Sequence, residues 1–112
     1  MFGTIKSSSE ISYIFSNGKR YNTPVITILV LKDPQQHGHL GRVAFIAGKK
    51  NGNAVWRNSA KRRMREICRE LGGPWPNIDV VFLAKRKTTE LTYSKVLETC
   101  KKTFATILAN KG

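Results

Sequence analysis

The sequence has few acidic residues and no long apolar run. Seven Asp and Glu stand against 20 Lys and Arg in 112 residues, which gives a formal net charge of +13. A polyanion relieves the self-repulsion of such a chain, so a nucleic acid is the first candidate partner and an anionic membrane is the second. The longest apolar run, residues 24–31, is far shorter than the ~20 residues that span a bilayer, and the N-terminus does not resemble a secretory signal. We therefore expect a cytoplasmic protein with no membrane partner.

Candidate catalytic residues are also scarce. Metal-assisted cleavage of a phosphodiester needs clustered carboxylates, and the acidic residues are spread along the sequence: Glu10, Asp33, Glu66, Glu70, Asp79, Glu90 and Glu98. His37 and His39 are the only pair of His, and they lie in a stretch rich in Gly and Gln that is typical of a hairpin tip. Cys68 and Cys100 are far apart, which is typical of free thiols packed in a reducing compartment. We expect no catalytic residue, metal site or cofactor in this chain.

The length of the chain, residues 1–112, suits a single domain with one core. Caps, periodicity and turn residues predict six elements: a helix from Ser7 to about Gly18, strands at 24–32 and 42–47, a helix at 55–71, a strand at 78–84 and a helix at about 92–109. We expect the first two strands to pair as a hairpin with a long loop. The order α-β-β-α-β-α, with a single β-α-β crossover, predicts an α+β fold in which helices cover a mixed sheet.

The helix at 55–71 carries the strongest functional signal. At about 100° per residue, its apolar residues share one face, and the adjacent flank holds four cations and an amide. The flank consists of Asn58, Lys61, Arg62, Arg65 and Arg69, with Arg57 at its N-terminal edge. Helices that merely face solvent usually mix charges at a spacing of four residues, whereas Lys61 and Arg65 have like charge. Because Arg binds phosphates and stacks on bases, the flank favours a nucleic-acid surface over the alternative, a solvated helix without a ligand.

A loop rich in Gly and Lys, residues 48–53, precedes this helix. Lys49 and Lys50 follow a predicted strand, and the flanking Gly48 and Gly52 permit backbone conformations that turn amides towards an anion. The pattern GxxxxGK[ST] of a nucleotide-binding P-loop is absent. The loop alone is a weak signal, and it indicates a function only together with the basic helix that follows it.

Together, the loop and helix read GKKNGNAVWRNSAKRRMRE, which is similar to the signature of the ribonuclease P protein family. The matching residues are Lys49, Lys50, Gly52, Asn53, Ala54, Val55, Arg57, Asn58, Lys61, Arg62 and Arg65. The resemblance covers nearly the whole chain, including the Asp-Val-Val-Phe strand and the Leu-Thr-Tyr before the last helix. Ser59 stands in place of the last Arg of the family's Arg-Asn-Arg triplet, and Ile11 stands where an aromatic residue is common.

The resemblance implies a two-layer α-β sandwich like the second domain of ribosomal protein S5, with a left-handed β-α-β crossover. It also implies an accessory, non-catalytic subunit that assists a catalytic RNA in removing the 5′ leader of precursor tRNA. Both RNAs would be partners, magnesium would accompany the RNA subunit, and no DNA partner is expected. In this family the basic helix docks on the catalytic RNA, and the cleft between the sheet and the first helix holds the leader as a single strand.

The resemblance assigns two sets of residues by position. The RNA-subunit set is Lys50, Asn53, Arg57, Asn58, Lys61, Arg62, Arg65 and Arg69. The leader set is Ile11, Phe15, Lys49, Lys85 and Arg86. Two alternatives remain: another basic RNA-binding module, such as a ribosomal protein, and an independent endoribonuclease.

Overall fold

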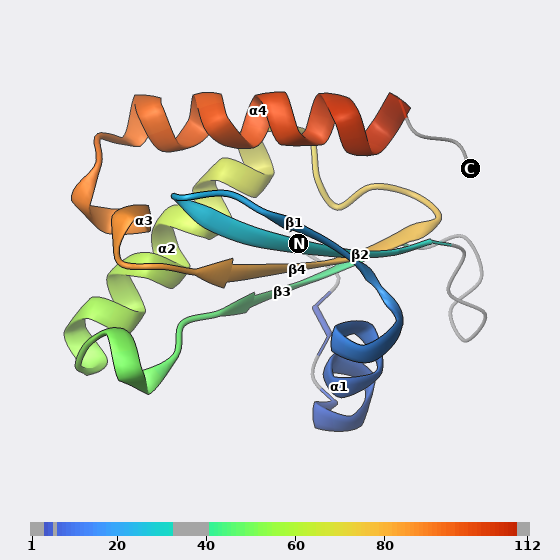
Figure 1. The fold of residues 1–112 in the computed structure, drawn as a ribbon, viewed down its shortest axis with the longest axis horizontal. Coiled ribbons are helices and arrows are strands. Elements are labelled where there is room, and N and C mark those ends of the chain that lie inside the picture. Colours follow the sequence, from blue (N-terminus) through green and yellow to red (C-terminus); the bar gives the residue numbers. More distant parts are fainter. Residues whose placement is uncertain (1–3, 6, 33–40, 110–112) are drawn as a thin grey trace.

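A four-stranded sheet organises the protein (Figure 1), and the computed structural model describes residues 4–5, 7–32 and 41–109. The strand order across the sheet is β1-β2-β4-β3. The strands are β1 (Lys19–Asn22), β2 (Ile26–Lys32), β3 (Arg42–Ile46) and β4 (Ile78–Ala84). The helices are α1 (Ser8–Asn17), the short 3-10 helix η1 (Lys49–Asn51), α2 (Ala54–Glu70), α3 (Lys87–Glu90) and α4 (Tyr93–Ala109). All six predicted elements are present, and the α+β class is confirmed.

The two central strands, β2 and β4, pair antiparallel. The predicted hairpin between residues 24–32 and 42–47 is therefore wrong, because β4 lies between β2 and β3. Five of the seven residues of β2 and six of the seven of β4 are buried. In the centre of the sheet, such apolar strands form hydrogen bonds along both backbone edges, and other elements can cover both of their faces. The turn-rich residues 33–39, with His37 and His39, lie outside the described residues.

The hairpin that does form joins β1 to β2, and β1 was not predicted. Its sequence, Lys-Arg-Tyr-Asn, lacks alternating apolar residues, and most of it is exposed. The strand exists because it pairs antiparallel with β2, so tertiary context overrides a weak local signal. The turn is held by Thr23, whose Oγ1 accepts hydrogen bonds from the N–H groups of Val25 (3.2 Å) and Ile26 (3.0 Å).

The remaining strand, β3, pairs parallel with β4. Parallel neighbours need a crossover connection, and α2 provides it. In Figure 1 both strands run to the left, β4 lies above β3 and α2 passes behind the sheet, so the crossover is left-handed. This agrees with the resemblance and departs from the usual right-handed rule.

Apolar clusters cover both faces of the sheet. The larger cluster lies between the sheet and the pair α2 and α4, and Met64, Phe82 and Phe104 belong to it. The smaller cluster packs Ile14 of α1 against Leu29, Ala44 and Val81 of the sheet, together with Ile5. Figure 1 accordingly shows α1 on the opposite side of the sheet from α2 and α4. The predicted core face of α2 is confirmed: Ala60, Met64, Ile67 and Cys68 are buried, and Leu71 packs against the same cluster.

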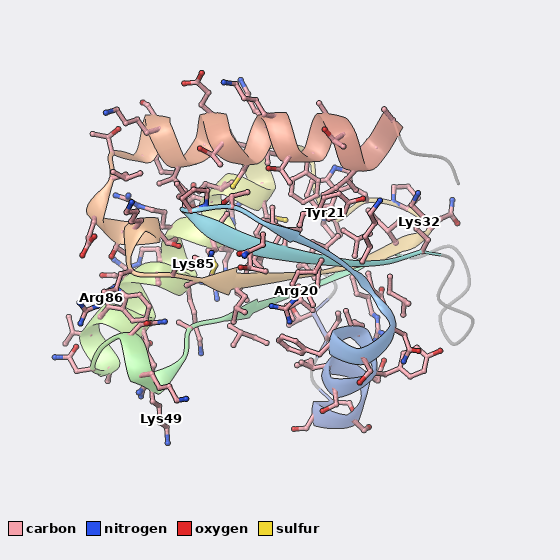
Figure 2. All side chains as sticks on the ribbon, viewed as in Figure 1. Arg20, Tyr21, Lys32, Lys49, Lys85 and Arg86 are labelled. Atoms are coloured by element: carbon pink, nitrogen blue, oxygen red, sulfur yellow. The ribbon has the colours of Figure 1, made fainter. Side chains whose placement is uncertain are left out.

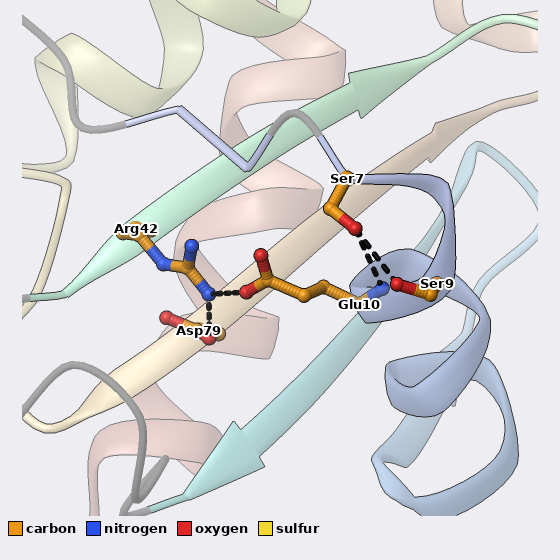
Figure 3. A network of polar contacts seen from close by, with 5 residues as sticks. All are labelled: Ser7, Ser9, Glu10, Arg42 and Asp79. Carbon is orange, nitrogen blue, oxygen red and sulfur yellow. Dashed lines mark hydrogen bonds and ion pairs between the residues drawn. The ribbon is translucent and has the colours of Figure 1, made fainter.

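An ionic network ties α1 to the sheet (Figure 3). The Nη2 of Arg42 donates to Glu10 Oε2 at 2.5 Å and to Asp79 Oδ2 at 3.0 Å. Burial lowers the pKa of Arg42, but the hydrogen bonds and charges of Asp79 and Glu10 outweigh that effect and raise it. Ser7 caps the same helix by accepting the N–H of Glu10 at 3.4 Å. Glu10 therefore holds α1 in place over the strands.

We predict that the two thiols are inert in the native protein. Cys68 and Cys100 are free and buried, and burial raises the pKa of each to about 12. Because the thiolate is the nucleophile, neither should react with DTNB at pH 8, and both should react after unfolding in guanidinium chloride. Rapid release of two equivalents from native protein would contradict this.

The same shifts predict a pH dependence of stability. Between an ordinary thiol pKa of 9.0 and the native value of about 12, the folded chain binds more protons than the unfolded chain. The free energy of unfolding should therefore fall as pH rises through that window. Replacement of both Cys by Ala should remove this part of the slope in denaturant titrations.

Candidate nucleic-acid interface

The helix α2 begins at an asparagine cap. The side-chain oxygen of Asn53 accepts the N–H of Trp56 at 3.0 Å. The indole N–H of Trp56 in turn donates to Thr89 Oγ1 at 2.8 Å and anchors the first turn beside α3. Asn53 was predicted to contact RNA, and the structure gives its oxygen a capping role. The amide nitrogen of Asn53 takes no part in this cap.

The predicted RNA-subunit residues lie along α2 and the segment before it. We call this set the basic flank: Lys50, Asn53, Arg57, Asn58, Lys61, Arg62, Arg65 and Arg69. Six of the eight are exposed, whereas Arg57 and Lys61 are half-buried. The apolar face of the same helix is packed on the sheet, so Asn58, Arg62, Arg65 and Arg69 lie on a part of α2 that meets solvent.

Two cations of the basic flank have neighbours of their own. The guanidinium of Arg65 stands 5.6 Å from the ring centroid of Phe45, which fixes it beside β3. Arg69 pairs with Glu66, with 2.8 Å between Nη1 and Oε1, and both side chains are more than half exposed. Exposed pairs of this kind contribute only about 0–1 kcal/mol to stability. A phosphate can therefore compete with Glu66 for Arg69.

Arg63 stabilises the fold and is not part of the basic flank. Its Nη1 donates to the backbone carbonyls of Leu91 at 2.6 Å and Thr88 at 3.2 Å. Its guanidinium also lies 6.0 Å from the ring centroid of Tyr93. These contacts hold the segment between α3 and α4 against α2. These contacts take Arg63 away from the flank, so it does not replace the cation missing at Ser59.

The predicted leader residues divide into two groups. Ile11 and Phe15 come from α1 and pack half-buried against the smaller cluster. Figure 2 places Lys49, Lys85 and Arg86 towards the end where β3 and β4 finish, away from α1. The structure therefore does not gather these five residues into one cluster.

Lys85 is held in place by the β1–β2 turn. Its Nζ donates to Asn22 Oδ1 and to the carbonyl of Thr23, both at 2.6 Å. Thr88 reinforces this corner, because its buried hydroxyl donates to the carbonyl of Val25 at 2.7 Å and accepts the N–H of Lys85 at 3.0 Å. The Lys85 ammonium is thus positioned by backbone and amide oxygens and has no carboxylate among these partners.

Within residues 4–5, 7–32 and 41–109, no three His, Cys, Asp or Glu side chains are grouped so that they could hold a metal ion. None of the helices described there combines the length and the apolar character needed to cross a membrane.

Comparison with known proteins identifies the family. The model of the family described as Ribonuclease P matches residues 3–108. The chain belongs to the ribonuclease P protein family. The ribonuclease P protein component of Natranaerobius thermophilus is 36% identical over 94 residues, which cover 82% of this chain and 78% of the relative. The component of an Exiguobacterium species is 36% identical over 103 residues, which cover 89% and 85%.

A solved structure supports the same fold. The ribonuclease P protein of Staphylococcus aureus superposes with a TM-score of 0.80 over 96% of each chain, at 19% identity. At that identity the likeness speaks for the fold alone. The arrangement of helices around the mixed sheet is therefore that of ribonuclease P proteins.

One residue beside the basic flank was not assigned a role from the sequence. Val55 is 74% exposed in the first turn of α2, and at about 100° per residue it falls next to Arg62 on the helical wheel. It is part of the signature that resembles the ribonuclease P protein family. Val55 is thus an exposed apolar residue beside a surface otherwise made of cations and amides.

Adjacent arginines of α2 should behave differently when each is replaced. Arg63→Ala removes hydrogen bonds to the Thr88 and Leu91 carbonyls, and we expect a loss of about 1–3 kcal/mol in the free energy of unfolding. Arg62→Ala changes an exposed side chain, and its effect should stay within about 0.5 kcal/mol. Urea titrations monitored by circular dichroism compare the two. Equal destabilisation would contradict the structural assignment of Arg63.

Proposed function

We propose that this chain is the protein subunit of ribonuclease P, binding the catalytic RNA and the 5′ leader of precursor tRNA. Maturation of the 5′ end of tRNA is the function of this family, and the holoenzyme, with this subunit as its accessory, is the ribonuclease. The observation that carries the proposal is the basic flank, which presents the family's signature residues on the solvent side of α2. No residue of this chain is assigned a catalytic role.

Docking on the catalytic RNA is supported by the shape and charge of α2. Folded RNA is recognised mainly through its shape, phosphates and 2′-hydroxyls. A helix whose exposed side carries Arg62, Arg65 and Arg69 offers planar, multidentate donors for phosphates. Asn58 and Val55 extend the contact between those charges. Magnesium is expected to accompany the RNA subunit, and the cleavage chemistry is assigned to that RNA.

Binding of the leader is supported by residues of α1 and of the segments that follow β3 and β4. Phe15 offers part of an aromatic ring on which a base can stack, and Lys85, Arg86 and Lys49 supply cations for the backbone of a single strand. Ile11 widens the apolar part of this surface. Because Ile11 and Phe15 pack on the face of the sheet opposite α2, the apolar part of the leader surface would be separate from the surface that docks on the catalytic RNA.

The cytoplasm is the proposed location of this activity. Both Cys are free thiols in the structure, which suits a reducing compartment.

A cleavage assay with each component omitted tests the proposal against its alternatives. The protein, the catalytic RNA and magnesium together should remove the 5′ leader at low ionic strength faster than the RNA and magnesium alone. The protein alone should not cleave. Cleavage by the protein alone would favour an independent endoribonuclease, and no stimulation of the RNA would favour another RNA-binding module, such as a ribosomal protein.

Removal of single cations from the basic flank tests the docking surface. Arg62→Ala and Arg65→Ala should each weaken binding to the catalytic RNA and reduce the slope of log affinity against log salt concentration by about one per lost phosphate contact. Lys101→Ala is a matched control, since Lys101 is an exposed cation on α4. Filter binding at several salt concentrations gives both quantities. Unchanged slopes for the two Arg variants, or an equal change for Lys101→Ala, would refute docking through α2.

A further inference from the structure

A cation beside the ring of Phe15 in α1 comes from β1, the strand that was not predicted from the sequence. Arg20 pairs with Leu29 across the β1–β2 ladder, and Leu29 belongs to the cluster beneath α1. Residues opposite one another in a ladder point to the same face of a sheet. The side chain of Arg20 therefore lies on the α1 side, where its guanidinium stands 6.0 Å from the ring centroid of Phe15.

We propose that Arg20 is a leader-binding residue that acts together with Phe15. This inference rests on the proposed function, because it names an additional contact within the leader surface. Arg20 is exposed and Phe15 is half-buried, so the pair has one side in contact with the core and another towards solvent. A guanidinium beside an aromatic ring provides a planar surface for an unpaired base and N–H donors for its phosphate.

The charges of α1 show why a cation from another element is needed there. Residues 8–17 contain Glu10 and no Lys or Arg. A strand of RNA that stacks on Phe15 would therefore find no cationic partner for its phosphates on α1 itself. Arg20 supplies one, and Figure 2 shows it between α1 and the group formed by Lys85 and Arg86. It thereby links the two separate groups of predicted leader residues.

The alternation of β1 provides a matched control within two residues. Lys19 pairs with Val30, which belongs to the cluster on the α2 and α4 side of the sheet. Its Nζ lies 5.3 Å from the ring centroid of Tyr21, which packs on that same cluster. Lys19 and Arg20 are both exposed cations of one edge strand, yet they serve opposite faces. A general electrostatic effect would involve both, whereas a leader contact would involve Arg20 alone.

The experiment compares Arg20→Gln with Lys19→Gln in the reconstituted holoenzyme. The affinities for precursor tRNA with a single-stranded leader and for mature tRNA are measured, and their ratio isolates the contribution of the leader. Arg20→Gln should reduce that ratio about five-fold or more, the loss of one stacking or phosphate contact. Lys19→Gln should change it less than about two-fold. The affinity of Arg20→Gln for the catalytic RNA, measured without tRNA, should stay at the wild-type value.

The outcomes separate this inference from the function on which it rests. A wild-type holoenzyme that binds both tRNAs with equal affinity would refute leader binding itself. A wild-type preference for the leader that Arg20→Gln leaves intact, or that Lys19→Gln reduces equally, would overturn the role of Arg20 alone. Phe15→Leu provides a second check. If the two side chains form one contact, Arg20→Gln should have a smaller effect in the Phe15→Leu background, and independent effects would contradict the pairing.

Discussion

Strands β3 and β4 run in the same direction and end side by side, with Ile46 opposite Leu83. The segments that follow them, which carry Lys49 and Lys85, therefore emerge at one end of the molecule. The same pairing obliges the chain to cross the sheet between the two strands. The crossing element, α2, must bury one side against β3 and β4 and expose the other. The basic flank is the exposed side of a helix that the topology requires, so RNA binding uses a rigid part of the fold.

The sequence predicts α2 well because its two faces differ so strongly. Apolar residues at helical spacing and a run of cations beside them allow only one orientation on a core, and the structure has that orientation. The sequence predicts a segment less well where its structure depends on pairing with other strands. The periodicity of the sequence does not reveal that β4 lies between β2 and β3. The order of strands in a sheet depends on which strands the helices can cover on both faces. Likewise, β1 is a strand only because β2 offers it a partner.

The candidate site shows the same division. Exposure of Arg62 and Arg65 follows from their place on the wheel, and so does the separate role of Arg63, although its carbonyl partners could not be read from sequence. Asn53 matched the family signature, yet its oxygen caps α2. The approach of Arg20 to Phe15 depends on the register of an unpredicted strand. Long-range geometry of this kind is absent from local patterns.

The chain has few carboxylates, and those that lie near an arginine form ion pairs with it. Asp79 and Glu10 share Arg42 (Figure 3), and Asp79 is 1% exposed. The partly buried Arg42 thereby pairs with acids from β4 and α1 at once. The positive charge of this protein thus falls into two classes, a small number of cations that hold elements together and a larger number that face solvent.

The two edges of the sheet are protected in different ways. At β3, Thr4 forms a bridge with Val43, and the N–H of Ile5 donates to the Val43 carbonyl at 2.9 Å. At β1 the edge carries Lys19 and Arg20, and cations on an edge strand discourage pairing with a strand of another molecule. Two copies that meet edge to edge would bring like charges together. The charge that suits the chain to RNA thus also guards it against aggregation before it has found its partner.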